Sequence, residues 1–280
     1  MTDDVLRYAA FTDRPTGGNP AGVVLDAAGM SDEEMLAIAA ELGYSETAFL
    51  TGGGGAEREI RYFSPLAEVP FCGHATVATA VALAERNGAG DVVFQTRSGP
   101  VPVSSRRDDQ GRITATLTSV APHVDELDEM DLDEALAALG WAREELDPEL
   151  PPRVAFAGAH HLVIGAATRE RLADLDYDFD RLGALMAARD WTTVQLVWRE
   201  QLLRFHSRNP FPPGGVVEDP ATGAAAAAFG AYLRDLGLVE APATVTILQG
   251  EDLGRPGRLL VDIHGDRPEI DVTGEAVPIE

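Results

Sequence analysis

Two segments of the chain predict helices that are apolar on nearly every face. One reads HATVATAVALAE, over residues 74–85, and the other reads TGAAAAAFGAYLRDL, over residues 222–236. A helix without a polar face has to be buried on all sides. Short β-rich runs flank both segments, so the sequence predicts strands that curl around a central helix in each half of the chain.

The rest of the pattern indicates a mixed α+β fold. Amphipathic segments at residues 132–139, 169–175 and 180–188 predict helices that pack outside the strands. The strands are expected at residues 47–50, 59–64, 113–118, 154–158, 162–167, 192–198, 202–207, 244–249, 259–264 and 269–272.

Ser31 and Glu34 form a capping-box signature, which predicts a helix over residues 32–42 that ends at Gly43. The glycine tract at residues 52–55 joins two expected strands and indicates a hairpin loop. A phosphate-binding loop would need a following helix and a Lys-Ser/Thr end, and this tract has neither.

The length of 280 residues exceeds the usual size of one compact core, so two domains are expected. Ser119, Pro122 and the acidic run after them break the strand pattern. We therefore expect an N-terminal lobe over residues 1–118 and a C-terminal lobe over residues 119–280. The sequence leaves open whether the final strands return to the first lobe.

The chain is strongly acidic, with 46 Asp and Glu against 22 Lys and Arg and a formal charge of -24. This charge repels a nucleic-acid backbone or an anionic membrane, so neither is an expected partner. Residues 1–14 lack the apolar core of a secretory signal, and no spanning segment is apparent. The single cysteine, Cys72, excludes an intrachain disulfide, and a cytoplasmic location is expected.

Both apolar helices begin with a glycine next to a polar residue, Gly73 with His74 and Thr222 with Gly223. The first turn of a helix leaves backbone N–H groups unpaired and concentrates partial positive charge. Both helix starts are therefore candidate cradles for a substrate carboxylate, and they would stabilise charge as a carbon-bound proton leaves. This chemistry needs no cofactor.

Each candidate residue also has an ordinary explanation. Asp219 and Thr222 stand where Asp or Thr commonly caps a helix. His74 is either a satisfied core group or a site residue, and Glu46 alone is compatible with a solvated turn acid. Spacing does not decide between these interpretations.

Two further motifs favour structural interpretations. Arg255, within Gly254-Arg255-Pro256-Gly257, either presents a guanidinium to a carboxylate or forms a tight turn, and we favour the turn. His160 and His161 are adjacent on an expected strand and therefore face opposite sides, so they are not expected to bind one metal ion together. No metal site is expected elsewhere in the chain.

Five segments in this order resemble the PhzF-like family of phenazine biosynthesis, relatives of diaminopimelate epimerase. The resemblance covers nearly the whole chain. It implies a cytoplasmic homodimer whose monomer has the α+β fold of diaminopimelate epimerase: two similar lobes, each a β-barrel-like sheet around a buried helix, with the active site between them. The segments are FTDRPTGGNPAGVVL (residues 11–25), GYSETAFL (43–50), FSPLAEVPFCGHAT (63–76), EDPATG (218–223) and QGEDLGRPG (249–257).

The resemblance also implies roles for single residues. Glu46 matches the general acid/base that takes a proton from one carbon and returns it to another. His74 and Asp219 match residues that flank the substrate and support this transfer. Cys72 falls where the epimerase relatives carry one catalytic thiol, and because it is the only cysteine a two-thiol racemase is excluded. Pocket-lining or substrate-binding roles are expected for Asn19, Cys72, Gly73, Thr222, Gly223, Ala224 and Arg255.

Ala224 departs from the phenazine enzymes, which carry a serine directly after the DP-x-TG motif. The loss of one hydroxyl can change substrate discrimination strongly, although it leaves the expected base intact. We therefore predict a cofactor-independent isomerase that acts on a small carboxylate-bearing substrate. Two alternatives stay open: an epimerase or racemase acting at one stereocentre, and a catalytically silent binding or scaffold protein with the same fold.

Overall fold

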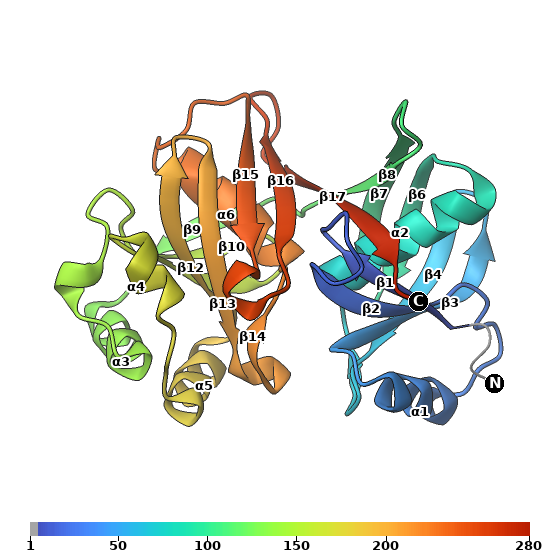
Figure 1. The fold of residues 1–280 in the computed structure, drawn as a ribbon, viewed down its shortest axis with the longest axis horizontal. Helices are drawn as coiled ribbons and strands as arrows, with labels where there is room; N and C mark the ends of the chain where they lie inside the picture. The colour runs from blue at the N-terminus through green and yellow to red at the C-terminus, as the bar shows by residue number, and fades with distance from the viewer. Residues whose placement is uncertain (1–4) are drawn as a thin grey trace. The chain divides into compact units, whose positions relative to one another are not determined.

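The computed structural model describes residues 5–280. Residues 1–4, which belong to the segment expected not to be a secretory signal, lie outside the described residues. Contacts divide the chain into two compact units (Figure 1). Of the described residues, unit 1 comprises 5–118 and 273–280, and unit 2 comprises 119–272. Within residues 5–280, no helix combines the length and the apolar character needed to cross a membrane.

The strands of unit 1 close into a barrel. Pairing runs from β1 through β2, β3, β4, β6, β7 and β8 to β17, and β17 pairs with β1. The closed ring leaves no edge between its first and last strands. The strands are β1 (Leu6–Ala10), β2 (Asn19–Val24), β3 (Glu46–Gly54), β4 (Glu57–Phe63), β6 (Asp91–Thr96), β7 (Gly99–Arg107), β8 (Ile113–Thr118) and β17 (Ile270–Pro278), with β5 (Glu68–Val69) paired to β4.

Helix α2 (Gly73–Asn87) is the central helix of unit 1, and it packs against β1, β2, β3, β7 and β8. Its residues from His74 to Ala82 are all buried, as the apolar sequence predicts. Helix α1 (Asp32–Leu42) packs outside, against β3 and β4. Its ends confirm the prediction, because Ser31 and Glu34 form the capping box and Gly43 adopts the left-handed conformation.

Unit 2 has its own sheet around a second apolar helix, α6 (Gly223–Asp235), which packs against β9, β10, β11, β12 and β16. Pairing runs in the order β9, β10, β11, β12, β13, β15, β16, and β14 pairs with β13. The strands are β9 (His123–Glu126), β10 (Arg153–Phe156), β11 (His160–Gly165), β12 (Trp191–Gln201), β13 (Arg204–Phe211), β14 (Val216–Asp219), β15 (Ala243–Gln249) and β16 (Gly257–Ile263).

The amphipathic helices of unit 2 share a separate core with the sheet. Leu136, Leu182 and Met186 from α3 and α5 pack with Ile164 and Leu196 from β11 and β12. This packing confirms the outer helices expected from the sequence. They are α3 (Glu129–Leu139), α4 (Arg169–Ala173) and α5 (Phe179–Arg189), and the short 3-10 helices are η1 (Arg143–Glu145), η2 (Pro212–Gly214) and η3 (Glu251–Leu253).

Two expected boundaries are wrong. Gly52, Gly53 and Gly54 are paired with β4 as strand, so the hairpin turn lies only at Gly55 and the residue after it. The expected strand at residues 202–207 begins later, because residues 202 and 203 form the exposed turn between β12 and β13. In both places the strand ladder, and not local propensity, sets the boundary. The sequence did not indicate strands β1, β2, β5, β6, β7, β9 and β14. The α+β fold with a barrel around a buried helix is confirmed.

Candidate functional site

The start of helix α2 brings three titratable side chains together inside unit 1. Cys72, the residue before the helix, is extended, and His74 lies in the first helical turn. Glu46 begins strand β3, which runs parallel to β2. Because the two strands are parallel, their starts lie at one edge of the barrel, next to the helix start.

The three side chains are within contact distance of one another. Glu46 Oε2 lies 3.5 Å from His74 Nε2 and 3.5 Å from Cys72 Sγ. Cys72 Sγ lies 3.3 Å from His74 Nδ1 and 3.8 Å from its Nε2. The side chains of His74 and Glu46 are 5% and 13% exposed, so the carboxylate keeps limited access to solvent. We call Glu46, Cys72 and His74 the proton-transfer cluster.

Neighbouring polar groups orient the imidazole of His74. The amide nitrogen of Asn19 lies 3.0 Å from Nδ1 and donates to it. The imidazole proton is thereby assigned to Nε2, which faces Glu46 and lies 3.4 Å from Ser45 Oγ. Burial lowers the pKa of His74, and the Glu46 carboxylate only opposes this shift. The imidazole is therefore neutral at pH 7 and acts as a hydrogen-bonding group rather than a cation.

The second group of expected site residues lies in unit 2, at the start of helix α6. Asp219 ends β14 and is 5% exposed, and its Oδ2 accepts a hydrogen bond of 2.6 Å from Thr222 Oγ1. Thr222 occupies the N-cap position, but its side chain makes no capping hydrogen bond. The Thr222 hydroxyl therefore does not cap α6, and it donates its hydrogen bond to Asp219 instead.

Gln249, from β15, holds the loop before α6 and had no role in the sequence-based prediction. Its Nε2 donates to the carbonyl of Asp219 at 2.7 Å and to Thr222 Oγ1 at 3.0 Å. Its Oε1 accepts from the backbone N–H of Thr222 at 3.1 Å. One buried amide thus fixes both ends of the segment that carries Asp219.

Glu218, beside Asp219, forms a buried ion pair that the sequence did not indicate. Arg208 donates through Nε and Nη2 to the Glu218 carboxylate, with the shortest contact at 2.5 Å, and through Nη1 to the carbonyl of Ala173 at 2.6 Å. Burial raises the pKa of Glu218, and Arg208 opposes the shift. The pair anchors β14 against β13 just before Asp219.

The remaining expected residues lie nearby in sequence. Gly223 is the buried first residue of α6, and Ala224 follows it half-buried. Gly250 has a φ of 82°, and the N–H of Arg255 donates to its carbonyl at 2.9 Å. The backbone therefore forms the tight turn between β15 and β16, while carboxylate binding by Arg255 stays a prediction.

His160 and His161 have separate neighbours on the two faces of β11. His161 is buried, and its Nδ1 lies 2.8 Å from Thr193 Oγ1. His160 packs against the ring of Phe156, with ring centroids 4.9 Å apart. Burial lowers the pKa of His161 to about 3, so it is a neutral core residue.

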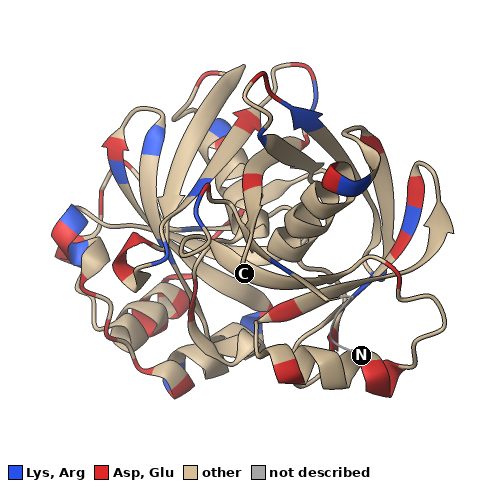
Figure 2. Cartoon of the chain, turned by 45° about the vertical axis from the view of Figure 1, so that its right-hand side comes forward, with Lys and Arg blue, Asp and Glu red and all other residues tan. Residues whose placement is uncertain are grey.

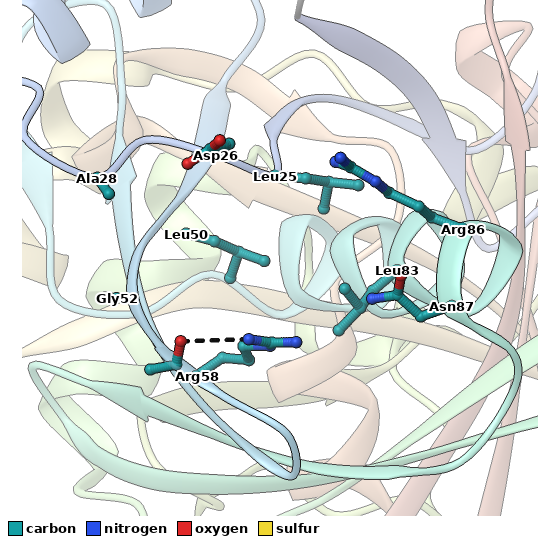
Figure 3. Close-up of a pocket in the computed structure, with 10 residues that line it drawn as sticks. Leu25, Asp26, Ala28, Leu50, Gly52, Arg58, Leu83, Arg86 and Asn87 are labelled. Atoms are coloured by element: carbon teal, nitrogen blue, oxygen red, sulfur yellow. Dashed lines mark hydrogen bonds between the residues drawn. The ribbon is translucent and has the colours of Figure 1, made fainter.

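A cavity of about 290 Å³ in unit 1 lies among other residues (Figure 3). Its lining includes Asp26, Arg58, Arg86 and Asn87, and Arg58 Nη1 donates to the carbonyl of Gly53 at 3.2 Å. Arg86 and Asn87 are at the carboxyl end of α2, where the helix dipole disfavours an anion. None of the cluster residues lines this cavity, and the cluster remains the candidate site of unit 1.

The chain matches the phenazine biosynthesis-like protein family over residues 8–280. It is 32% identical over 283 residues to the uncharacterized isomerase YfhB of Bacillus subtilis, a match that covers 98% of this chain and 96% of that protein. It is 30% identical over 274 residues to trans-2,3-dihydro-3-hydroxyanthranilate isomerase of Pseudomonas fluorescens, covering 96% and 94%. These names agree with the isomerase class expected from the sequence.

Solved structures confirm the expected epimerase-like fold. A PhzF-family phenazine biosynthesis protein of Bacillus anthracis superposes with a TM-score of 0.87 at 27% identity, over 99% of this chain and 96% of that chain. A hydroxyproline epimerase from Agrobacterium vitis shares the fold alone, with a TM-score of 0.62 at 13% identity, over 98% and 90%. Sequence and structure agree that the chain belongs to the phenazine biosynthesis-like protein family.

Proposed function

We propose that this chain is a cofactor-independent isomerase that moves a proton between two carbons of a small carboxylate-bearing substrate. The observation that carries the proposal is the contact of Glu46 with His74 and Cys72, each at 3.5 Å, at the start of a buried helix. Glu46 takes the proton from one carbon and returns it to another. The substrate keeps its atoms and its oxidation level, so the reaction requires no electron acceptor.

The surroundings of Glu46 suit this role. A carboxylate that is only 13% exposed loses most competing water, and general bases of this kind act directly on carbon-bound protons. The neutral His74 supplies a hydrogen bond from Nε2 without adding a positive charge that would weaken the base. The unpaired N–H groups at the start of α2 are oriented to stabilise a substrate carboxylate or the charge that develops on proton loss.

We also propose Asp219, Thr222 and Gly223 as residues of the same reaction, as the family resemblance implies. Asp219 is held rigidly by Thr222 and Gln249, and the start of α6 offers a second set of unpaired N–H groups. Ala224 stands at the second position of this helix without a hydroxyl. The substrate therefore need not be the one named for the Pseudomonas fluorescens relative.

The position of Cys72 favours a second candidate function, an epimerase acting at one stereocentre. Its thiol lies 3.5 Å from Glu46 Oε2, close enough to exchange a proton with the carboxylate. In this alternative, Glu46 or Cys72 acts on one face of the carbon and Asp219 acts on the other. Deuterium from solvent would then enter the stereocentre itself.

The test is incubation in deuterium oxide with a panel of amino and hydroxy carboxylates that includes trans-2,3-dihydro-3-hydroxyanthranilate. We expect the wild type to incorporate carbon-bound deuterium in at least one substrate, and we expect Glu46→Gln to abolish this exchange. Glu33→Gln, at an exposed position of α1, is the matched control. Equal exchange by Glu46→Gln would remove Glu46 as the base, and the labelled position separates isomerase from epimerase. No exchange with any substrate would favour a binding or scaffold role.

A further inference from the structure

The proton-transfer cluster combines the three side-chain types that bind zinc in proteins. Glu46 supplies a carboxylate, Cys72 a thiol and His74 an imidazole, and one ligand atom from each lies within 4.8 Å of the others. All three come from unit 1, so the cluster is complete within one unit.

The separations between the three ligand atoms are close to those at three corners of a tetrahedron. Bonds of about 2.3 Å to sulfur and about 2.0 Å to nitrogen and oxygen, at tetrahedral angles, separate sulfur from the lighter atoms by about 3.5 Å and nitrogen from oxygen by about 3.3 Å. The observed separations are 3.8 Å for Cys72 Sγ to His74 Nε2, 3.5 Å for Sγ to Glu46 Oε2, and 3.5 Å for Nε2 to Oε2. Each differs from the ideal by no more than about 0.3 Å. Cys72 Sγ is also 3.3 Å from His74 Nδ1, so the thiol lies over the imidazole ring and not along the Nε2 lone pair. Binding of an ion at Nε2 therefore requires the thiol to rotate toward the side of the ring that faces Glu46.

We propose that Glu46, Cys72 and His74 bind one thiophilic divalent cation, Zn²⁺ being the best fit, and that the bound ion inhibits the enzyme. The thiol releases its proton to solvent on binding, and the fourth position is open to water. The cation holds the carboxylate oxygen that would otherwise accept the substrate proton. Binding of the ion stands on the cluster geometry alone, whereas inhibition rests on the proposed function.

In the metal-bound protein, Asn19 would fix which nitrogen of the His74 imidazole carries the proton. Nε2 must be free of its proton to bind the ion, so the proton moves to Nδ1. The Asn19 amide, 3.0 Å from Nδ1, then turns its oxygen to accept that proton. Metal-bound histidines almost always donate their other N–H to such an acceptor. The thiolate selects Zn²⁺, Cd²⁺ or Co²⁺ over Mg²⁺ and Ca²⁺, which prefer oxygen ligands.

Binding is measured on the full chain with reduced thiol, by competition of Zn²⁺ with a chromophoric chelator and by absorption of the Co²⁺ complex. We expect one ion per chain, a cobalt–thiolate charge-transfer band, and neither effect with Mg²⁺. Cys72→Ser should abolish the band and weaken zinc binding by at least the roughly 100-fold that loss of an outer-sphere partner can cost. Circular dichroism of each variant reports its folding.

His206→Gln is the matched control, because His206 lies between Glu251 (2.6 Å) and Glu200 (3.4 Å) without a thiol. It should keep the cobalt band and the zinc affinity of the wild type. Absence of the band in the wild type, or an equal band in folded Cys72→Ser, would overturn the proposal.

The deuterium-exchange assay separates this proposal from the proposed function. Exchange that stops on addition of one equivalent of Zn²⁺ and returns with a chelator supports both. An exchanging protein that binds no zinc refutes the metal site alone. A protein that binds zinc through Cys72 but catalyses no exchange refutes the isomerase function and leaves the metal site standing.

Discussion

At the scale of single residues, one physical effect, burial, acts on two histidines with different surroundings. His74 and His161 are both buried, and burial lowers the pKa of each. His74 keeps polar contacts to Asn19 and Ser45 next to Glu46, whereas His161 contacts only Thr193 among the side chains described for it. The same desolvation therefore tunes a candidate site residue in unit 1 and only stabilises a neutral core residue in unit 2.

His161 should make the protein less stable in acid. Its pKa is about 3 in the folded state and about 6.5 when unfolded, so only the unfolded chain binds the proton between these values. Its contribution to stability is complete above pH 6.5 and is lost as the pH falls, by about 2 kcal/mol at pH 5. We expect the free energy of unfolding, measured with urea, to fall from pH 7.5 to pH 5 in the wild type. In His161→Gln this fall should be smaller by about 2 kcal/mol. A fall of the same size in His161→Gln and the wild type would contradict the role of His161. His123→Gln, at the surface, is the reference variant.

At the scale of elements, short strands and loops hold the expected site residues in place. Strand β14 is anchored by the pair of Arg208 with Glu218, and the loop after it by Gln249. Gly250 completes this arrangement, because a Cβ there would lie 2.3 Å from the carbonyl oxygen of Arg255 and 2.7 Å from that of Pro220. Only glycine fits between these two backbones.

Arg208→Met should destabilise unit 2 strongly. It leaves the Glu218 carboxylate buried without its cation, and removal of one partner of a buried pair costs about 3–5 kcal/mol. Arg181→Met, which breaks the half-exposed pair with Glu134, should lower the free energy of unfolding far less. Chemical denaturation measures both variants. Equal effects would show that burial does not distinguish the two pairs, and Arg208→Met with Glu218→Gln should recover part of the loss.

At the scale of the whole molecule, uncompensated negative charge is the dominant feature. Asp and Glu outnumber Lys and Arg by 46 to 22, and Figure 2 shows the acidic residues spread over helices and loops of the chain. Many arginines are already engaged in ion pairs, for example Arg61 with Glu68 and Arg143 with Asp133. The excess acids repel one another in the compact state.

Salt should therefore stabilise the protein. Raising the ionic strength from about 0.01 M to about 0.1 M shortens the Debye length from about 30 Å to about 10 Å and screens repulsion between distant acids. We expect the melting temperature, measured by calorimetry at pH 7, to rise over this range. A constant or falling melting temperature would mean that local ion pairs, which salt weakens, outweigh the net charge. The homodimer implied by the family resemblance stays a prediction that sedimentation velocity tests.

The sequence by itself determined the features that depend on neighbouring residues. Residues 74–85 and 222–236 lack a polar face and can only be buried helices, and Ser31 with Glu34 fixes the start of α1 within one turn. These patterns act over a few residues and are legible in one chain. The roles expected for Glu46, His74 and Asp219 came from the family resemblance, whose segments are each contiguous in the sequence.

Only the tertiary structure decided which of these residues meet. His74 contacts Asn19 across 55 positions and Ser45 across 29, and Cys72 contacts Glu46 across 26. Parallel pairing of β2 with β3 and insertion of α2 into the barrel bring them together. Gln249 opens the family segment at residues 249–257, but its contacts with Asp219 and Thr222 could not be read from the sequence, and Arg208 carries no motif signal, because their partners come from other strands and loops. Strand register and barrel closure set such contacts, and local propensity does not encode them.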